Sequence, residues 1–224
     1  MMNIINWVIL LKKIYTICSI FLIFASFLIT SYANVTFPHI VLDAGHGGMD
    51  GGTSVGDVKE SDLTLEIVFK IRELLISKGY VVTLTRENKN SLCEGKFIKR
   101  TDMNKRVEII NNSNADLAVS IHLNHYSDSK YKGAQVFYCD NIEENGMLAS
   151  SIQDSIINKL KNTDRKIVIR KNIYLLNRVA SPTCIIECGF MSNYNEFLLL
   201  KSSSYQHMLA EAIVDGISVY IRKR

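Results

Sequence analysis

Short apolar runs alternate with longer helical segments along most of this chain, and that alternation limits the folds open to it. Six runs are short, rich in β-branched residues and mostly apolar on both faces, so we expect strands at residues 40–43, 81–84, 117–121, 134–138, 173–176 and 184–187. Four longer segments have helical spacing, at residues 62–77, 101–112, 142–160 and 204–221. The pattern predicts an α/β three-layer sandwich, with a mixed, mostly parallel sheet of about six strands and helices on both faces.

The first 33 residues differ from the rest of the chain. Lys12 and Lys13 precede an uncharged, strongly apolar stretch at residues 14–32, and the small residues at 31–33 suit a signal peptidase. The stretch is also long enough to span a bilayer, so a cleaved signal peptide and a retained membrane anchor both remain open. The positive N-terminal flank places the remainder, residues 34–224, outside the cytoplasm in either case.

Residues 34–224 are expected to form one catalytic domain, since we find no internal repeat or linker. The whole chain has 26 basic and 22 acidic residues and no basic stripe with interleaved aromatics, which argues against nucleic-acid binding. Cys184 and Cys188 lie four apart on a predicted strand, roughly 13 Å by strand rise, which is too far for a disulfide. We interpret both as small buried apolar residues.

Three chemically reactive side chains follow or end predicted strands. His46 comes after the first strand, His122 ends the third and Glu187 ends the last. In open α/β sheets the functional residues gather at the carboxyl ends of the strands, so we expect these side chains at one edge. Two imidazoles and one carboxylate are the ligands of a catalytic zinc with an open position, and a second carboxylate nearby serves as general base. The pattern indicates a metal-dependent hydrolase.

The loop of residues 45–52 is rich in glycine around His46. Its glycines could cradle a phosphate, but the dinucleotide fingerprint fails because Asp50 stands where the third glycine is required. The other use for such a loop is close approach of the backbone around the imidazole, so that His46 reaches a metal while substrate lies against the loop. We favour the ligand interpretation over an ordinary loop histidine.

The other candidates also have ordinary structural explanations. Glu60 opens a helix, where an acidic residue commonly offsets the helix dipole. His122 could be a hydrogen-bonded core histidine; for His125 and Asn124, just after it, we favour contact with substrate. Glu187 is the least ordinary, because a carboxylate among Cys, Ile and Phe is costly to bury without a partner. A metal-bound water would be such a partner, and desolvation would raise the pKa of Glu187 towards the range useful for proton transfer.

Four segments, spaced in order from residue 40 to the final helix, resemble the zinc-dependent N-acetylmuramoyl-L-alanine amidases of the amidase type 3 family. They are Val-Leu-Asp-Ala-Gly-His-Gly-Gly-Met-Asp-Gly-Gly at 41–52, Lys-Glu-Ser-Asp-Leu at 59–63, Ser-Ile-His-Leu-Asn at 120–124 and Glu-Cys-Gly-Phe-Met-Ser-Asn at 187–193. The resemblance implies a zinc held by His46, Glu60 and His122, with Glu187 serving catalysis. Ala44 departs from the family's usual proline and Cys188 from a more usual apolar residue, and neither change touches the expected chemistry.

Residues 133–138, 161–165 and 173–176 look more particularly like the germination-specific cortex amidases of spore-forming bacteria. This resemblance implies cleavage of the amide between N-acetylmuramic acid and L-alanine in peptidoglycan, so that a deacetylase can close the muramic-δ-lactam of the cortex. It also implies a forespore-envelope location. Because a polymer cannot enter a closed pocket, we expect an open groove for glycan and stem peptide. A zinc carboxypeptidase or deacetylase acting on the cell wall, and a non-enzymatic membrane-anchored wall-binding protein, remain alternatives.

Some relatives in this family carry a long insertion after the second histidine, which forms a helix that blocks the zinc. Here only residues 123–132 separate His122 from Gly133, too few for a useful blocking helix. We therefore expect no self-inhibition through this loop. An exposed ligand set can hold zinc weakly, so an external protein partner that braces the ligand loops would raise its zinc affinity.

Overall fold

The computed structural model describes residues 3–32 and 37–224 and divides into two units, Met1–Phe37 and Pro38–Arg224. The first unit contains helix α1 (Ile4–Tyr32). Its segment Ile4–Phe24 is the one helical stretch among the described residues with the length and composition to cross a membrane, which fits a signal sequence as well as an anchor. The predicted boundary between residues 33 and 34 lies outside the described residues.

The second unit is built on a six-stranded sheet in the order β4-β1-β5-β8-β6-β7. Strands β4 (Val81–Leu84), β1 (His39–Ala44), β5 (Leu117–Asn124) and β8 (Thr183–Phe190) run parallel to one another. Strand β6 (Gln135–Tyr138) pairs antiparallel with β8, and β7 (Val168–Ile169) continues parallel to β6. The prediction of a mixed, mostly parallel sheet is confirmed.

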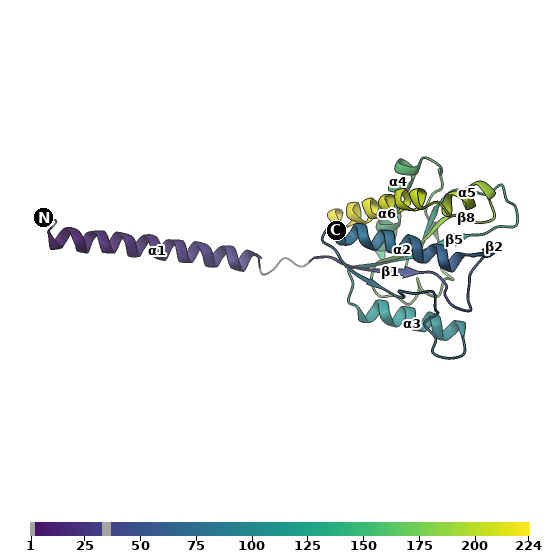
Figure 1. Ribbon diagram of the computed structural model, residues 1–224, viewed down its shortest axis with the longest axis horizontal. Helices are drawn as coiled ribbons and strands as arrows, with labels where there is room; N and C mark the ends of the chain where they lie inside the picture. The colour runs from purple at the N-terminus through teal and green to yellow at the C-terminus, as the bar shows by residue number, and fades with distance from the viewer. Residues whose placement is uncertain (1–2, 33–36) are drawn as a thin grey trace. The chain divides into compact units, whose positions relative to one another are not determined.

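Helices cover both faces of this sheet (Figure 1). One face carries α2 (Glu60–Ser77), α4 (Glu143–Leu160) and α6 (Ser203–Lys223), and the other carries α3 (Lys99–Asn112). The remaining elements are α5 (Tyr194–Leu200) and a hairpin of β2 (Ser54–Val55) and β3 (Val58–Lys59), which leads directly into α2.

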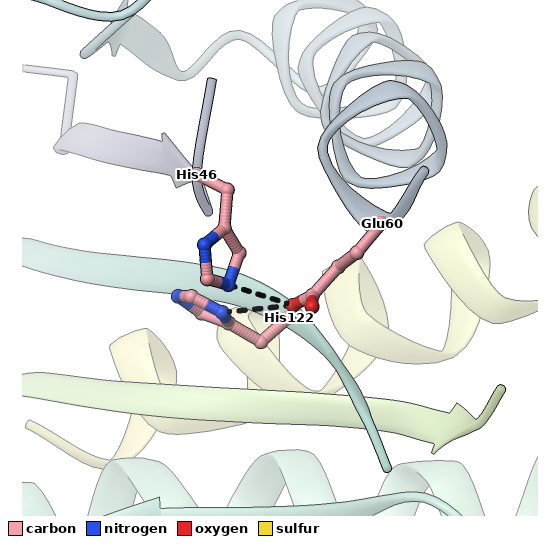
Figure 2. Close-up of side chains that lie close together, drawn as sticks. All are labelled: His46, Glu60 and His122. Atoms are coloured by element: carbon pink, nitrogen blue, oxygen red, sulfur yellow. Dashed lines mark hydrogen bonds and ion pairs between the residues drawn. The ribbon is translucent and has the colours of Figure 1, made fainter. Parts of the chain in front are cut away.

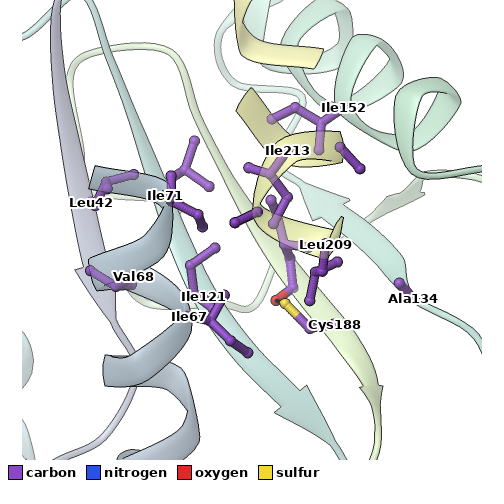
Figure 3. Packing of buried hydrophobic residues seen from close by; sticks show 14 of the residues in the cluster. Leu42, Ile67, Val68, Ile71, Ile121, Ala134, Ile152, Cys188, Leu209 and Ile213 are labelled. Atoms are coloured by element: carbon purple, nitrogen blue, oxygen red, sulfur yellow. Dashed lines mark hydrogen bonds between the residues drawn. The ribbon is translucent and has the colours of Figure 1, made fainter. Parts of the chain in front are cut away.

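The larger core lies between the sheet and the face of α2, α4 and α6. Alternate strand residues such as Leu42 and Ile121 point to this face and pack against Val68, Ile71 and the apolar side of α6 (Figure 3). Residues of opposite parity point towards α3, where Val41 forms a second, smaller cluster with Ile110 and Ala118. Because both faces are covered, the central strands are apolar on both sides.

One predicted strand is wrong. Residues 173–176 form turns instead, closed by bonds from Asn177 N–H to the Ile173 carbonyl and from Val179 N–H to the Leu175 carbonyl. Leu175 and Leu176 are buried against the α3 face of the sheet, which explains their apolar character without strand pairing. The edge of the sheet is occupied by β7, a strand too short for sequence periodicity to reveal.

Other differences affect the ends of elements. Strands β5 and β8 continue beyond His122 and Glu187, so these residues lie within the last part of each strand and not at its end. Helix α5 was not predicted, because its seven residues are too few for a clear period. Cys184 and Cys188 are free and fully buried, as expected for small apolar side chains.

Candidate metal centre

His46 follows β1 in a loop that passes very close to two other site residues. A Cβ atom on Gly45 would lie 2.4 Å from the His122 ring, and one on Gly52 would lie 2.4 Å from Glu60 Oε2. Gly52 also has a φ of +67°, which favours glycine. These two glycines therefore allow the loop to bring the imidazole of His46 against Glu60 and His122.

Glu60, the first residue of α2, joins the two imidazoles (Figure 2). Its Oε1 atom lies 3.2 Å from His46 Nε2 and 3.1 Å from His122 Nδ1. The two imidazole rings meet edge to face with centroids 5.0 Å apart. One potential ligand atom from each of the three residues lies within 4.8 Å of the others. Sequence positions as distant as 46 and 122 thus converge on a single point.

The carboxylate of Glu60 is held in its charged form. It accepts hydrogen bonds from the backbone N–H groups of Thr53 and Leu123. Burial opposes its ionisation, but hydrogen bonds and charge from His122 and His46 outweigh that effect and lower the pKa of Glu60. In return, Glu60 raises the pKa of His46 although burial acts to lower it. The charged carboxylate of Glu60 therefore favours a positive charge, on a proton or a metal ion, in the space between the three side chains.

The residues present fit a zinc ion. Zinc lies about 2.0–2.1 Å from nitrogen and oxygen ligands, so the ligand atoms of a tetrahedral site stand about 3.3 Å apart. The separations of 3.2 Å and 3.1 Å between Glu60 Oε1 and the two imidazole nitrogens match this spacing. Two imidazoles and one carboxylate also leave one tetrahedral position open.

Glu187 lies beside this cluster on the neighbouring strand. It is directly paired in register with His122, through the parallel contact of β5 and β8. Its Oε2 atom is buried and has no hydrogen-bond partner. Burial raises the pKa of Glu187, and the nearby charge of Glu60 adds to this against the opposing effect of the two histidines. Such an unpartnered carboxyl group with a raised pKa is suited to exchange a proton with a bound reactant.

A cavity of about 220 Å³ opens beside the cluster on the α3 face of the sheet. His46, His122 and Glu187 line one part of it. Apolar walls come from α3, from β8 and from the turns that the sequence wrongly predicted as a strand: Met103, Ile173, Leu175 and Ile185. Charged side chains also line the cavity: Asp43, Asp50, Lys99, Asp102 and Arg106. The cavity therefore offers a reactant an apolar surface next to the potential ligands and the unpartnered carboxyl group.

Two residues predicted to contact substrate lie away from this cavity. Asn124 uses its Oδ1 atom to accept the N–H of His125, and the side chain of His125 is exposed. Sequence reasoning also missed Asp50, whose Oδ1 lies 3.0 Å from His46 Nδ1. A carboxylate on the second nitrogen of a ligand histidine fixes the orientation of the ring. Its position four residues after His46 in the glycine-rich loop was the available signal.

Fold and site together define a class of protein: an α/β hydrolytic enzyme whose reactive side chains gather near the carboxyl ends of parallel strands. The chain belongs to the N-acetylmuramoyl-L-alanine amidase family (Amidase_3), whose model matches residues 40–219. This match confirms the family that the four sequence segments predicted, and with it the assignment of the chain as an amidase.

Individual relatives agree with this assignment. The chain is 42% identical to the germination-specific N-acetylmuramoyl-L-alanine amidase of Bacillus subtilis over 190 residues, which are 83% of this chain and 80% of that protein. The structure of the CwlD amidase of Clostridioides difficile, in complex with the GerS lipoprotein, matches with a TM-score of 0.79 and 40% identity, over 84% of this chain and 100% of that one. Another N-acetylmuramoyl-L-alanine amidase, from Clostridium difficile 630, matches with a TM-score of 0.76 and 30% identity over 84% and 98% of the two chains.

Proposed function

We propose that this chain is a zinc-dependent amidase that cleaves the bond between N-acetylmuramic acid and L-alanine in spore cortex peptidoglycan. The observation that supports it best is that a potential metal-ligand set and a potential proton-transfer group lie side by side. Potential ligand atoms of His46, Glu60 and His122 cluster within 4.8 Å, and Glu187 stands in register with His122. A ligand set with an adjacent proton-transfer group is what metal-assisted amide hydrolysis requires.

The side chains divide the work between them. His46, Glu60 and His122 would hold a zinc ion, which when bound would supply Lewis-acid activation of the amide carbonyl and of water. Glu187 takes the proton from the attacking water at its carboxylate and delivers it to the leaving nitrogen of L-alanine. Its unpartnered Oε2 atom leaves this carboxyl group free for both transfers.

The biological setting of the proposal comes from the N-terminal helix and from the relatives. Segment Ile4–Phe24 has the length and composition of an export signal or a membrane anchor, which supports a location of residues 38–224 outside the cytoplasmic membrane. The Bacillus subtilis relative is a germination-specific amidase, and this supports action on the spore cortex in the forespore envelope. Asn124 and His125, on the strand end and loop beyond His122, remain candidates for contact with the glycan or stem peptide.

An activating protein partner is a further part of this proposal. The CwlD amidase of Clostridioides difficile was solved in complex with the GerS lipoprotein. The loop between β5 and β6, which the structure describes in full, contains no helix, so no blocking element of that kind lies after His122. Regulation by a separate protein fits a domain without this built-in inhibitor.

Product analysis on purified spore sacculi tests the proposal. The protein is stripped of metal by a chelator, divided, and assayed with and without one equivalent of zinc. We expect zinc to restore release of stem peptides with intact L-alanine amino termini, detected by mass spectrometry. Loss of terminal residues would indicate a carboxypeptidase, loss of acetate a deacetylase, and absence of any product together with stoichiometric wall binding a non-enzymatic role.

A further inference from the structure

Two buried arginines, Arg86 and Arg106, donate hydrogen bonds to the backbone of the loop that carries His46. Both are almost fully buried, with 4% and 2% of their surface exposed. Together they donate to the carbonyl groups of three successive residues, Ala44, Gly45 and His46. Three adjacent carbonyls held by charged donors make an unusually constrained segment, because hydrogen bonds from charged groups are stronger than neutral ones.

Arg106 connects this loop with the strand that bears His122. Its guanidinium donates to the Ala44 carbonyl at 2.7 Å and to Asp43 Oδ1 at 2.6 Å, and it also donates to the His46 carbonyl. The other carboxylate oxygen of Asp43 accepts from Ser120 Oγ at 2.6 Å. Ser120 lies two residues before His122 on β5. A continuous set of hydrogen bonds therefore runs from the backbone of one histidine to the strand of the other.

Arg86 connects the same loop with the helix that begins at Glu60. It donates to the carbonyls of Ala44 and Gly45 at 2.9 Å each. The nitrogen that contacts Gly45 also donates to the carbonyl of Ser61 at 2.8 Å, next to Glu60 in the first turn of α2. The two arginines thus tie the His46 loop to both of the other elements that supply potential ligands.

The backbone conformation of His46 is one that needs support from surrounding contacts. Its φ is +60°, in the left-handed region that is costly for residues other than glycine. Such a conformation persists only where surrounding contacts enforce it. The contact of Arg106 with the His46 carbonyl and of both arginines with the two preceding carbonyls is positioned to enforce it.

We propose that Arg86 and Arg106 are positioning residues that preorganise the metal-free site, so that zinc affinity depends on them although neither reaches the ion. This inference rests on the proposed metal centre. Loss of the hydrogen bonds from either arginine lets the His46 loop relax. Zinc binding must then restore the geometry of the loop, which lowers the affinity for zinc. Outer-shell contacts of this kind change metal affinity by about 10–100-fold.

Arg106→Lys and Arg86→Lys test the proposal in the full chain. Lysine keeps the positive charge among the buried groups, but its three N–H donors are on a single nitrogen, so they cannot reach the separated acceptors that the three nitrogens of a planar guanidinium contact together. We expect each variant to bind zinc about 10–100-fold more weakly in competition with a chromogenic chelator. With cobalt(II) in place of zinc, the visible absorption spectrum should shift, since it reports the arrangement of the ligands.

Asn145→Ala provides a control for loss of stability. Asn145 is also buried, and it bonds the Cys139 carbonyl and the Thr183 N–H at the other end of β8. This variant should melt at a lower temperature than wild type yet keep wild-type zinc affinity and the wild-type cobalt spectrum. If Arg106→Lys fails to fold, Arg86→Lys examines the same proposal through a separate guanidinium and a different partner element.

The outcomes separate this inference from the proposed function. Wild-type protein that binds no stoichiometric zinc would overturn the metal centre itself. Wild-type protein that binds zinc, with folded arginine variants that bind it equally well, would overturn only the positioning role. An affinity loss in Asn145→Ala as large as in the arginine variants would show that general destabilisation is the cause, and this too would overturn the positioning role.

Discussion

Two polar regions lie next to each other in this domain and differ in how well their groups are satisfied. In the candidate ligand cluster of His46, Glu60 and His122, the histidine side chains are 19% and 23% exposed. The Oε2 atom of the neighbouring Glu187 is buried without a hydrogen bond. In the layer beneath it, all three guanidinium nitrogens of Arg106 donate hydrogen bonds.

The difference indicates a division between reactivity and support. Unsatisfied buried polar atoms cost stability, and in native structures they occur where a ligand or a reaction uses them. A fully bonded polar network instead makes a rigid base, since every donor has a defined acceptor. The cluster of His46, Glu60 and His122 should therefore determine zinc binding and turnover. The hydrogen-bonded network around Arg106 should determine the stability of the domain and the geometry of that cluster.

The largest effect is expected for removal of a ligand. His122→Ala should abolish zinc binding and activity while the domain still folds, because His122 is partly exposed and lies outside the apolar core. Elemental analysis of the purified variant measures the zinc content. His207→Ala, at an exposed histidine of α6, is the matched control and should keep full zinc. Equal zinc in both variants would remove His122 from the ligand set.

Glu187→Gln should separate turnover from metal binding. Glutamine has nearly the same shape but cannot accept and return a proton, so turnover should fall by about 10²–10⁴-fold with the zinc content unchanged. Activity on spore sacculi and metal analysis of the same sample check both parts. Glu211→Gln, at a partly exposed carboxylate of α6, should change neither. A Glu187→Gln variant without zinc would mean that Glu187 is a ligand instead.

The network around Arg106 should make the stability of the domain depend on pH in the acid range. Burial opposes ionisation of Asp43, but Arg106, Ser120 and Thr85 outweigh it and lower its pKa to about 2 from an ordinary 3.8. Because the folded-state pKa is the lower one, the charged group stabilises the fold above about pH 4 and loses this contribution as the pH falls towards 2. The loss should be about 2 kcal/mol in the free energy of unfolding.

Denaturant titrations of zinc-free protein between pH 5 and 2, on wild type and on Asp43→Asn, measure this contribution as the difference between the two pH profiles. The comparison with Asp43→Asn is required because Glu60 also has a lowered pKa and affects the same range. Parallel profiles would show that Asp43 does not provide the acid sensitivity.

The smallest effect is expected at Asp50, on the border between the two regions. Asp50→Asn removes the charge beside His46 Nδ1 and weakens orientation of the ring, so zinc affinity should fall by about 10-fold. Chelator competition gives the value. Asp62→Asn, near the start of α2 and partly exposed, is a control for loss of one acidic charge near the site. The same small change in both variants would indicate a general charge effect.

The sequence predicted which reactive side chains come together better than it predicted the contacts that hold them. His46, His122 and Glu187 could be chosen as candidates because polar groups stand out beside apolar strands, and the glycines around His46 signal close approach. Arg106 lies in a segment with helical spacing, where an arginine ordinarily faces solvent. Its partner Asp43 is 63 positions away, and only the assembled sheet shows that the two charges meet.

The wrong strand at residues 173–176 has a similar origin. Its apolar residues are buried, as predicted, but local composition does not show which surface buries them. Turn-forming bonds such as Asn177 Nδ2 to the Ile173 carbonyl fix the segment against the α3 face, and such side-chain bonds have no periodic signature. Sequence reasoning is therefore strong where a periodic apolar pattern decides the structure and weak where single polar contacts decide it.

The register between β5 and β8 ties the chemistry of this domain to its core. Ile186 and Cys188 point into the large apolar cluster, and Glu187 between them points to the opposite face, level with His122. A slip of one residue would exchange the faces, placing the carboxylate in hydrocarbon and an isoleucine beside the histidine. Any substitution that disturbs the apolar alternation of β8 would therefore move Glu187 away from His122 without changing either residue. If Glu187 transfers the proton as proposed, the reaction depends on the packing of the core as well as on the residues of the site.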